Sequence, residues 1–541
     1  MPYSAPASTD SPAQTQLSSA PRGVEQQAAD DSLSGSGSVG GIDPDRLAIA
    51  LSVLDDVRDL SEDHPDFIAV RRATAHVFKA VKKSRRLDKR AQIASADRAV
   101  IALTATGAPD RIDDETRGIA LRPAIAAHAH DLTNPGLDSP NTAVPHSGEL
   151  LKSRPCYICK RRYTRVDSFY HQLCPDCAAM GHARRDARTD LTGRRALLTG
   201  GRAKIGMHIA LRLLRDGAHT TITTRFPRDA VRRFTGLPDS GDWLHRLRVV
   251  GIDLRDPAQV ISLTEAVSAA GPLDILINNA AQTVRRSAGS YAGLVEAESG
   301  DLPTGDLPDL LTFGHTADAH PLALAASVSS HPLLSVASAA TGRQSGPDLT
   351  TLALAAGSSS LDRLADGTAI DAAGLVPDRH AVNSWTQVVQ EVDPLEMLEV
   401  QLANVTAPFL LVSGLRPALA ASTARRKYVV NVSAMEGQFG RRYKGAGHPH
   451  TNMAKAALNM LTRTSAEEMF DTDRILMTSV DTGWITDERP HPTKVRLAEE
   501  GFHAPLDLVD GAARVYDPIV SGEAGQDLRG VFLKDYAPAA W

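Results

Sequence analysis

The amino-acid sequence predicts an α/β fold, in which a doubly wound parallel sheet is preceded by a small four-cysteine, zinc-ribbon-like module and an α-helical region. Three observations predict it. From about residue 194 onward, short apolar runs rich in β-branched residues alternate with helical segments, as in parallel sheets that are buried on both faces. The first of these runs leads into a glycine-rich turn. All four cysteines fall upstream of that turn, within CYICKRRYTRVDSFYHQLCPDC.

The composition is that of a soluble globular protein, with 42% hydrophobic and 23% charged residues in a chain of 541. A formal net charge of -5 argues against non-specific nucleic-acid binding by the protein as a whole. No uninterrupted apolar run approaches the roughly 20 residues that a membrane helix needs. The N-terminal MPYSAPASTDSPAQTQ does not resemble a secretory signal. We therefore expect a cytoplasmic location and no membrane association.

The N-terminal region divides into a tail, a helical region and a linker. Residues 1–41 are rich in Ser, Ala, Gln, Gly and Pro, so we expect a disordered tail. Residues 42–107 are predicted to be helical, because DPDRLAIALSVLDDVRDL combines an Asp cap, an early proline and apolar residues at helical spacing. The basic run KAVKKSRRLDKR forms either a solvated helix face or a docking surface for an acidic partner, RNA or a neighbouring subunit. Residues 108–149, with several prolines, are expected to be a linker.

The four cysteines form two CxxC pairs about fifteen residues apart, within a module at residues 150–182. Two such turns present four thiolates, which together can complete a tetrahedral zinc site. Because protein ligands fill all four positions, the metal is expected to be structural rather than catalytic. The alternatives are a pair of reducible CxxC redox motifs or a disulfide staple. The predicted zinc ligands are Cys156, Cys159, Cys174 and Cys177.

Residues 190–541 are expected to form the α/β domain. Its first strand, RRALLTG, precedes the helix IGMHIALRLLRDGA, and the further strands are HTTITTR, LRVVGIDL, LDILINNA, KYVVNVSA, RILMTSVDTG and GVFLKDY. An insertion at about residues 284–393 is far longer than a simple crossover. It leaves the C-terminal end of a central strand, where doubly wound sheets bind ligands. A substrate lid, a subunit contact and a partly disordered decoration all remain open for it.

The turn after the first strand, TGGRAKIG at Thr199–Gly206, opens a helix. Glycine at such a turn lets the backbone approach a pyrophosphate, which sits on the amide groups and positive dipole of the helix start. A glycine-rich turn is weak evidence by itself. Further motifs therefore have to support a dinucleotide site.

Such motifs follow in an order that resembles the short-chain dehydrogenase/reductase superfamily, from about residue 191 to the C-terminus. TGGRAKIG matches TGxxxGxG, NNAA at 278–281 resembles NNAG, and DTGWIT at 481–486 resembles the PGxxxT segment that cradles the nicotinamide. The resemblance implies a Rossmann-type sheet and an NAD(P) cofactor. It also implies a set of cofactor-binding residues, namely Thr199, Gly200, Arg202, Lys204, Ile205, Gly206, Arg225, Asp253, Leu254, Asn279, Ala280, Lys455, Gly483, Ile485 and Thr486.

Charge near the second strand indicates which cofactor is preferred. An acidic residue there would bind the ribose hydroxyls of NAD, whereas this chain has Arg225, with Arg202 in the glycine turn. Positive groups suit a 2′-phosphate, so NADP is favoured, with NAD as the alternative if these arginines are merely solvated. Lys204 replaces the middle glycine of the family's turn, where its side chain either crowds the phosphates or pairs with one of them.

The resemblance implies a catalytic tetrad, of which two members are kept. Asn404 and Lys455 fall at the family's asparagine and lysine, but Thr451 stands at the tyrosine and Ala434, preceded by Ser433, at the serine. The pKa of an alkyl hydroxyl is at least roughly 3 above that of a phenol, a penalty of about 4 kcal/mol for proton donation. Thr451 can therefore orient a substrate, but it is a poor proton donor.

Other proton donors lie in RRYKGAGHPHTNMAK, just before the lysine. Histidine titrates near neutrality and suits proton transfer, although either imidazole could instead cap the helix or bond the backbone. A glycine-containing loop could fold the tyrosine back into the site. The candidate catalytic residues are therefore Lys455, Asn404, Thr451, His450, His448, Tyr443 and Ser433.

These features favour an NADP-dependent oxidoreductase with non-standard acid–base residues, acting on a small-molecule carbonyl or alcohol. The alternative is an inactive NADP(H)-binding scaffold or sensor that works through a protein partner, contacted by the cysteine module and the basic helices. Nucleic-acid binding is a weaker option, because the chain is acidic overall. The family resemblance also implies a homo-oligomer assembled through the helices that carry Asn404 and Lys455.

Overall fold

The computed structural model describes residues 41–109, 111, 146–313, 371–378, 380–440, 444–485 and 488–541. Apart from Gly41, the predicted tail lies outside these ranges, as do most of the predicted linker and the middle of the insertion. The chain divides into two compact units, Met1–Leu87 and Asp88–Trp541. The α/β sheet and the four cysteines belong to the second unit.

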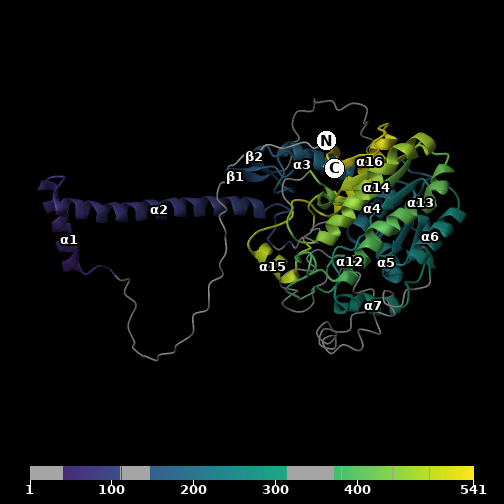
Figure 1. Ribbon diagram of the computed structural model, residues 1–541, viewed down its shortest axis with the longest axis horizontal. Helices are drawn as coiled ribbons and strands as arrows, with labels where there is room; N and C mark the ends of the chain where they lie inside the picture. Colours follow the sequence, from purple (N-terminus) through teal and green to yellow (C-terminus); the bar gives the residue numbers. More distant parts are fainter. Residues whose placement is uncertain are drawn as a thin grey trace, which may run out of the picture. The chain divides into compact units, whose positions relative to one another are not determined.

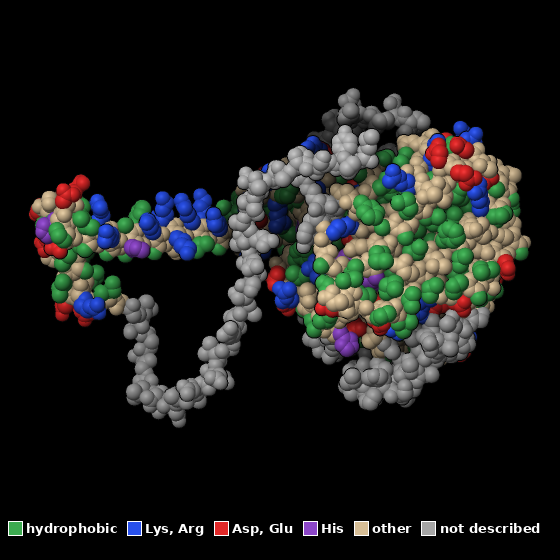
Figure 2. Space-filling model, in the orientation of Figure 1, with side chains coloured by type: hydrophobic (Ala, Val, Ile, Leu, Met, Phe, Trp, Pro, Cys, Tyr) green, Lys and Arg blue, Asp and Glu red, His purple; other side chains and the backbone are tan. Residues whose placement is uncertain are grey.

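The N-terminal helices are α1 (Pro44–Asp56), the 3-10 turn η1 (Val57–Asp59) and α2 (Pro65–Ala102), which crosses the boundary between the units. The Asp43 carboxylate caps α1 by accepting hydrogen bonds from the Asp45 and Arg46 amides, both at 3.1 Å. No residue of α1 is buried. Exposed basic side chains follow α2, as Figure 2 shows, at positions 79, 82, 83, 85, 86, 89 and 90.

The cysteine module consists of β1 (His146–Pro155), β2 (Arg162–Asp167) and α3 (Pro175–Asp186). The two strands pair antiparallel, with Glu149 opposite Arg165. The first strand begins inside the range that the sequence assigns to a linker. Pairing with β2 explains this, because His146 already lies opposite Asp167.

The large unit is built on a nine-stranded sheet in the order β11-β10-β9-β8-β6-β3-β4-β5-β7 (Figure 1). All neighbouring strands are parallel except β10 and β11, which pair antiparallel at one edge of the sheet. This confirms the predicted parallel α/β sheet. The strands are β3 (Arg195–Leu198), β4 (His219–Thr224), β5 (Leu247–Gly251), β6 (Ile275–Asn278), β7 (Asp309–Thr312), β8 (Lys427–Ser433), β9 (Ile475–Asp481), β10 (Phe532–Lys534) and β11 (Ala537–Ala539).

The described part of the insertion contributes to the sheet. After the 3-10 turn η4 (Ala288–Tyr291) and the helix α7 (Ala292–Ser299), the chain adds β7 in parallel beside β5, with Val249 opposite Leu310. Periodicity did not reveal this edge strand, because DLLT is only four residues long and three of the four are exposed.

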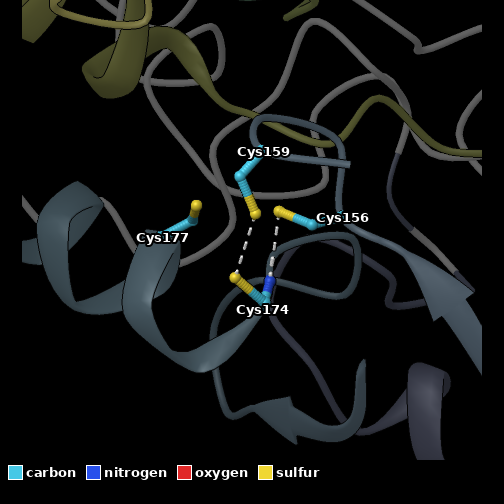
Figure 3. A group of neighbouring side chains, drawn as sticks. All are labelled: Cys156, Cys159, Cys174 and Cys177. Atoms are coloured by element: carbon cyan, nitrogen blue, oxygen red, sulfur yellow. Dashed lines mark hydrogen bonds between the residues drawn. The ribbon is translucent and has the colours of Figure 1, made fainter. Parts of the chain in front are cut away.

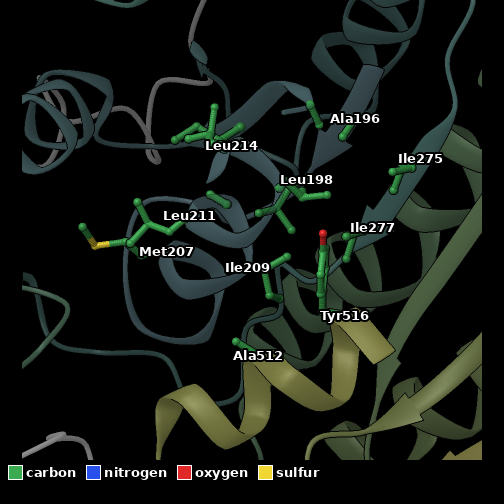
Figure 4. Packing of buried hydrophobic residues seen from close by; sticks show 14 of the residues in the cluster. Ala196, Leu198, Met207, Ile209, Leu211, Leu214, Ile275, Ile277, Ala512 and Tyr516 are labelled. Atoms are coloured by element: carbon green, nitrogen blue, oxygen red, sulfur yellow. The ribbon is translucent and has the colours of Figure 1, made fainter. Parts of the chain in front are cut away.

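Helices cover both faces of the sheet. One buried cluster joins the sheet to α4 (Lys204–Arg215), α5 (Pro227–Thr235) and α16 (Leu508–Glu523), and Figure 4 shows Ile209 and Tyr516 meeting strand residues there. The opposite cluster joins it to α6 (Pro257–Ala269), α13 (Ala407–Ala420) and α14 (Pro449–Asp473). The remaining elements are α12 (Pro394–Gln401), the π-helical turn η5 (Leu402–Thr406), α15 (His491–Glu499) and the 3-10 turns η2 (Ser240–Asp242), η3 (Leu244–Arg246) and η6 (Met435–Gly437).

The continuous helical run at residues 394–420 is long and apolar enough to cross a membrane by length and composition alone. Half of its apolar window is buried inside the fold, and a core helix passes the same test. Its buried members include Leu411 and Leu415, which pack in the cluster with α6. The sheet is therefore what covers this face of the helix.

Candidate active site

In the turn between β3 and α4, the backbone at Gly206 lies directly against the backbone at Gly200. Gly200 has φ of 69°, in the region that favours glycine. A Cβ on Gly206 would lie 1.9 Å from the Gly200 carbonyl oxygen, and a Cβ on Gly201 would lie 2.5 Å from Cγ2 of Ile222. The N-cap residue of α4, Ala203, has no side-chain cap hydrogen bond. The first amides of the helix and its positive dipole end therefore suit an anion such as a pyrophosphate.

Thr199 ties this turn to the end of β6. Its hydroxyl oxygen accepts hydrogen bonds from the amides of Asn279 and Ala280, both at 3.0 Å. The Asn279 side-chain amide in turn donates to the carbonyls of Thr199 and Gly200, at 3.0 and 3.2 Å. The structure thus brings together five residues that the sequence assigns to cofactor binding, Gly206 included.

Of the two arginines predicted to face a 2′-phosphate, Arg202 is already engaged. Its guanidinium is ion-paired with Asp229, which is 1% exposed and also accepts a 2.6 Å contact from Nε of Arg233. Burial lowers the pKa of Arg202, and the Asp229 carboxylate opposes that effect. The sequence did not show that Arg202 pairs with a buried carboxylate, and its contact with a 2′-phosphate stays a prediction.

Arg225, at the end of β4, is differently placed. Its Nη2 donates to the Tyr291 hydroxyl at 3.2 Å, and its guanidinium lies over the rings of Phe226 and Tyr291, at 5.7 and 5.2 Å from their centroids. Within the described part of the chain, no carboxylate pairs with it. Arg225 is therefore the better candidate for a phosphate contact.

Two further predicted cofactor residues are engaged with charged neighbours. Lys204 begins α4 with φ of 50°, and its Nζ lies 3.1 Å from the Asp371 carboxylate. The Asp253 carboxylate pairs with Nη2 of Arg255 at 2.8 Å. Leu254 and Ile205 are partly buried against the cores.

A buried lysine marks the predicted catalytic end of α14. Lys455 is 6% exposed, and its Nζ donates to the Val432 carbonyl at 2.8 Å. Burial lowers the pKa of Lys455 to about 8, and the Glu436 carboxylate opposes that effect. The lysine is therefore held against the end of β8, next to Ser433.

Polar groups around this lysine are buried without partners. The hydroxyls of Ser433 and Thr451 and both ring nitrogens of His450 make no hydrogen bond to the described residues, although each residue is only 2% exposed. Buried polar groups are normally paired, since an unpaired one is costly. Burial lowers the pKa of His450, so its imidazole is neutral at neutral pH. This arrangement suits a site that receives a polar ligand.

Asn404 lies in η5, the π-helical turn, and such turns often occur at functional sites. Its side-chain amide pairs twice with the backbone of Gln282: Oδ1 accepts from the Gln282 amide at 2.7 Å, and Nδ2 donates to the Gln282 carbonyl at 2.9 Å. Asn404 therefore fixes the chain directly after the NNAA segment.

The second imidazole, His448, anchors a loop. Its ring stacks on Trp385 with centroids 3.9 Å apart, and Nδ1 lies 2.9 Å from the Trp385 carbonyl oxygen. Of the two histidines, His450 is the one whose ring nitrogens are both buried without protein partners among the described residues. Tyr443 and Thr486, both predicted site residues, lie outside the described residues.

The predicted nicotinamide segment follows β9. Gly483 has φ of 79°, and a Cβ there would lie 2.6 Å from Cδ1 of Leu506. Ile485 is 3% exposed. The Trp484 amide donates to the Tyr157 hydroxyl at 2.9 Å. Sequence reasoning missed this contact, because 327 positions separate the two residues and nothing in the CYIC motif indicates which distant residue its tyrosine contacts.

The four cysteines converge, as Figure 3 shows, with Cys177 on α3 and the others on the turns beside it. Their sulfur atoms lie within 4.8 Å of one another, and none forms a disulfide. Zn–S bonds of about 2.3 Å in a tetrahedron place sulfurs about 3.8 Å apart, and the Cys159 and Cys174 sulfurs are 3.6 Å apart. Although burial opposes it, hydrogen bonding with Arg161 lowers the pKa of the Cys159 thiol to about 6. The donor set fits zinc.

Comparison with known proteins agrees with this geometry. The short chain dehydrogenase family model matches residues 194–293. An uncharacterized protein of Acanthamoeba polyphaga mimivirus is 31% identical over 377 residues, covering 68% of this chain and 71% of the viral protein. A protein of Streptomyces antibioticus named "Probable oxidoreductase" is 42% identical over 91 residues, 17% of this chain and 30% of that protein.

Among solved structures, a short chain dehydrogenase from Burkholderia cenocepacia J2315 in complex with NADP is similar. It has 19% sequence identity and a TM-score of 0.38, and the match covers 64% of this chain and 97% of that one. The family match and the oxidoreductase relatives agree with the glycine turn, the NNAA contacts and the lysine helix of this chain. The chain belongs to the short-chain dehydrogenase/reductase superfamily.

Proposed function

We propose that this protein is an NADP(H)-dependent oxidoreductase that acts on a carbonyl or alcohol substrate with non-standard acid–base residues. One observation carries the proposal: a buried lysine with a lowered pKa, Lys455, neighbours Ser433 and shares α14 with Thr451 and His450, whose polar groups are buried without protein partners. An inert scaffold would gain stability by replacing such groups with apolar ones. Their retention supports a working site.

The residues present fit a phosphorylated dinucleotide. In the turn at Gly200–Gly206, a Cβ on Gly206 would collide with the Gly200 carbonyl oxygen. The start of α4 offers backbone amides to a pyrophosphate. Arg225 would hold the 2′-phosphate, and the rings of Phe226 and Tyr291 support its guanidinium. When bound, NADP(H) would supply or accept the hydride.

Lys455 is the best-supported proton donor. With a pKa of about 8 it is mostly protonated at neutral pH, and its acidity is far closer to neutrality than that of a threonine hydroxyl. Thr451 lies one helical turn before it, and its hydroxyl would orient the substrate oxygen. Because the same group must act in both directions, Lys455 would take the proton back when the reaction runs toward the carbonyl. The neutral His450 imidazole is the alternative proton-transfer group. Asn404 would keep the neighbouring backbone in place through Gln282.

The test is NADPH oxidation by the full-length protein with a panel of aldehydes and ketones, compared with Lys455→Ala, Thr451→Val and His450→Gln. We expect turnover that Lys455→Ala abolishes. His450→Gln should lower the rate about 10²- to 10⁴-fold if the imidazole transfers the proton. NADPH binding without turnover across the panel would instead favour the scaffold or sensor function. Equal rates for Lys455→Ala and the unmodified protein would contradict the proposed mechanism.

A structural zinc ion at Cys156, Cys159, Cys174 and Cys177 forms a second part of the proposal. The convergence of four thiols without a disulfide supports it. Purified protein should contain about one zinc per chain, and Cys174→Ser should lose it. Folded protein without metal would contradict this assignment.

We also propose a homo-oligomer in the cytoplasm. Figure 2 shows hydrophobic side chains on the face where α12, α13 and α14 lie. On these three helices, five large apolar residues are between 50% and 59% exposed, namely Leu395, Leu398, Phe409, Met453 and Met460. Light scattering should give the mass of a dimer or a larger assembly, and Met453→Glu should shift the equilibrium toward the monomer.

Contact of a protein partner with the basic side chains of α2 stays a prediction.

A further inference from the structure

The chain from the end of β9 to the start of α16 begins with the predicted nicotinamide residues, and this segment shares a core with the four-cysteine module. Ile485, Leu506 and Leu508 belong to the same buried cluster as Cys156 and Cys174, and each of the three is at most 3% exposed. Residues on either side of α15 are therefore packed against the module. A change in the module's core would be felt directly along this segment, because close-packed interiors transmit strain.

Polar contacts fasten the same segment to Arg111 and to Tyr170 of the module. Arg111 donates to the carbonyls of Ala504 and Leu506 at 2.7 and 2.6 Å, and both guanidinium nitrogens involved are buried. The Tyr170 hydroxyl donates to the Asp510 carboxylate at 2.5 Å, where α16 begins. The C-terminal part of the segment is thus held at its backbone as well as through its side chains.

In the N-terminal part, the Tyr157 side chain holds the backbone. Its hydroxyl accepts the Trp484 amide, directly after Gly483 and before the buried Ile485. Tyr157 lies between Cys156 and Cys159, and its own amide donates to the Gln172 carbonyl at 2.8 Å. The position of the phenol therefore depends on the conformation of the cysteine turn.

We propose that Tyr157 is a positioning residue for the nicotinamide, through which the metal-bound cysteine turn sets the conformation of Gly483–Ile485. This rests on the proposed function, because it assigns to the module a role in the dinucleotide site. With the metal bound, the turn is fixed and the phenol holds the Trp484 amide. When the metal is lost, the four thiols no longer have a common centre, and the hold on Trp484 loosens.

The variant Tyr157→Phe removes the hydroxyl and keeps the ring. Hydrogen–deuterium exchange should show the Trp484 amide exchanging about tenfold faster or more, since a part-buried N–H loses its acceptor. The Kd for NADPH should rise about tenfold, equivalent to about 1.4 kcal/mol. Zinc content should stay that of the unmodified protein. Chelation of the metal from the unmodified protein should produce the same faster exchange at Trp484.

Tyr163→Phe is the matched control, because the Tyr163 hydroxyl donates at 2.7 Å to the His171 carbonyl within the module and does not touch the segment. It should leave Trp484 exchange and NADPH affinity unchanged. Unchanged exchange and affinity in Tyr157→Phe, or equal losses in both variants, would overturn the inference. Failure of the unmodified protein to bind NADPH would instead refute the proposed function, and the exchange measurement would still decide whether Tyr157 holds Trp484.

Discussion

Replacing Lys455 by methionine should stabilise the protein while it removes activity. Burial lowers the pKa of Lys455 from 10.5 to about 8, so keeping its charge in the folded state costs about 3 kcal/mol at neutral pH. Loss of the hydrogen bond to the Val432 carbonyl would offset about 1 kcal/mol of the gain. At pH 7 the free energy of unfolding should therefore rise by about 2 kcal/mol.

The pH dependence of this effect has a defined sign. The folded pKa of Lys455 is lower than the unfolded one, so between about pH 8 and 10.5 the unfolded chain binds more protons than the folded chain. The contribution of Lys455 to stability therefore rises with pH across this window. The advantage of the methionine variant should be largest below pH 8 and should disappear as the pH approaches 10.5.

Urea denaturation at two pH values, one near neutral and one between about 8 and 10.5, measures the difference in the free energy of unfolding between the variant and the unmodified protein. The control is Lys152→Met, because this lysine is exposed on β1 and the change should alter neither stability nor NADPH oxidation. A Lys455→Met variant that is less stable than the unmodified protein at pH 7, or that keeps its turnover, would refute the reasoning.

Two other predictions concern charges near the glycine turn. Arg225→Ser should raise the Kd for NADPH by about tenfold or more and leave that for NADH nearly unchanged, because only NADPH carries the 2′-phosphate. Fluorescence titration measures both constants, and equal losses would argue against a phosphate contact. Asp229→Asn should lower the free energy of unfolding by about 3–5 kcal/mol, since two buried guanidinium groups lose their carboxylate. Chemical denaturation measures this, and a change below about 1 kcal/mol would show that water screens the cluster.

Much of the fold was predictable, because periodicity and turn chemistry are local. The alternation of apolar strands with helices gave the parallel sheet, and TGGRAKIG gave the backbone approach seen at Gly206. The resemblance of NNAA and TNMAK to the family's motifs implied site roles for Asn279 and Lys455, and the structure places Asn279 at the turn and Lys455 at the end of β8. By contrast, β7 is too short and too exposed to leave a clear period in the sequence.

The partners of individual side chains could not be predicted from the sequence, because they come from distant segments. Arg202 is held by Asp229, and His448 stacks on Trp385, a residue from inside the long insertion. Each of these contacts changes what the side chain is free to do. The hold of Tyr157 on the predicted nicotinamide segment is of the same kind, since only the folded chain brings the two together.

The most direct test of the account is calorimetric titration of the full-length protein and of Gly206→Ala with NADPH. We expect about one NADPH per chain in the unmodified protein. Binding should be lost in the variant, because an added methyl would lie 1.9 Å from the Gly200 carbonyl and displace the turn. Gly241→Ala is the control, since a Cβ there meets nothing within 4 Å. Undiminished affinity in a folded Gly206→Ala variant, or no binding by the unmodified protein, would contradict a dinucleotide site at this turn.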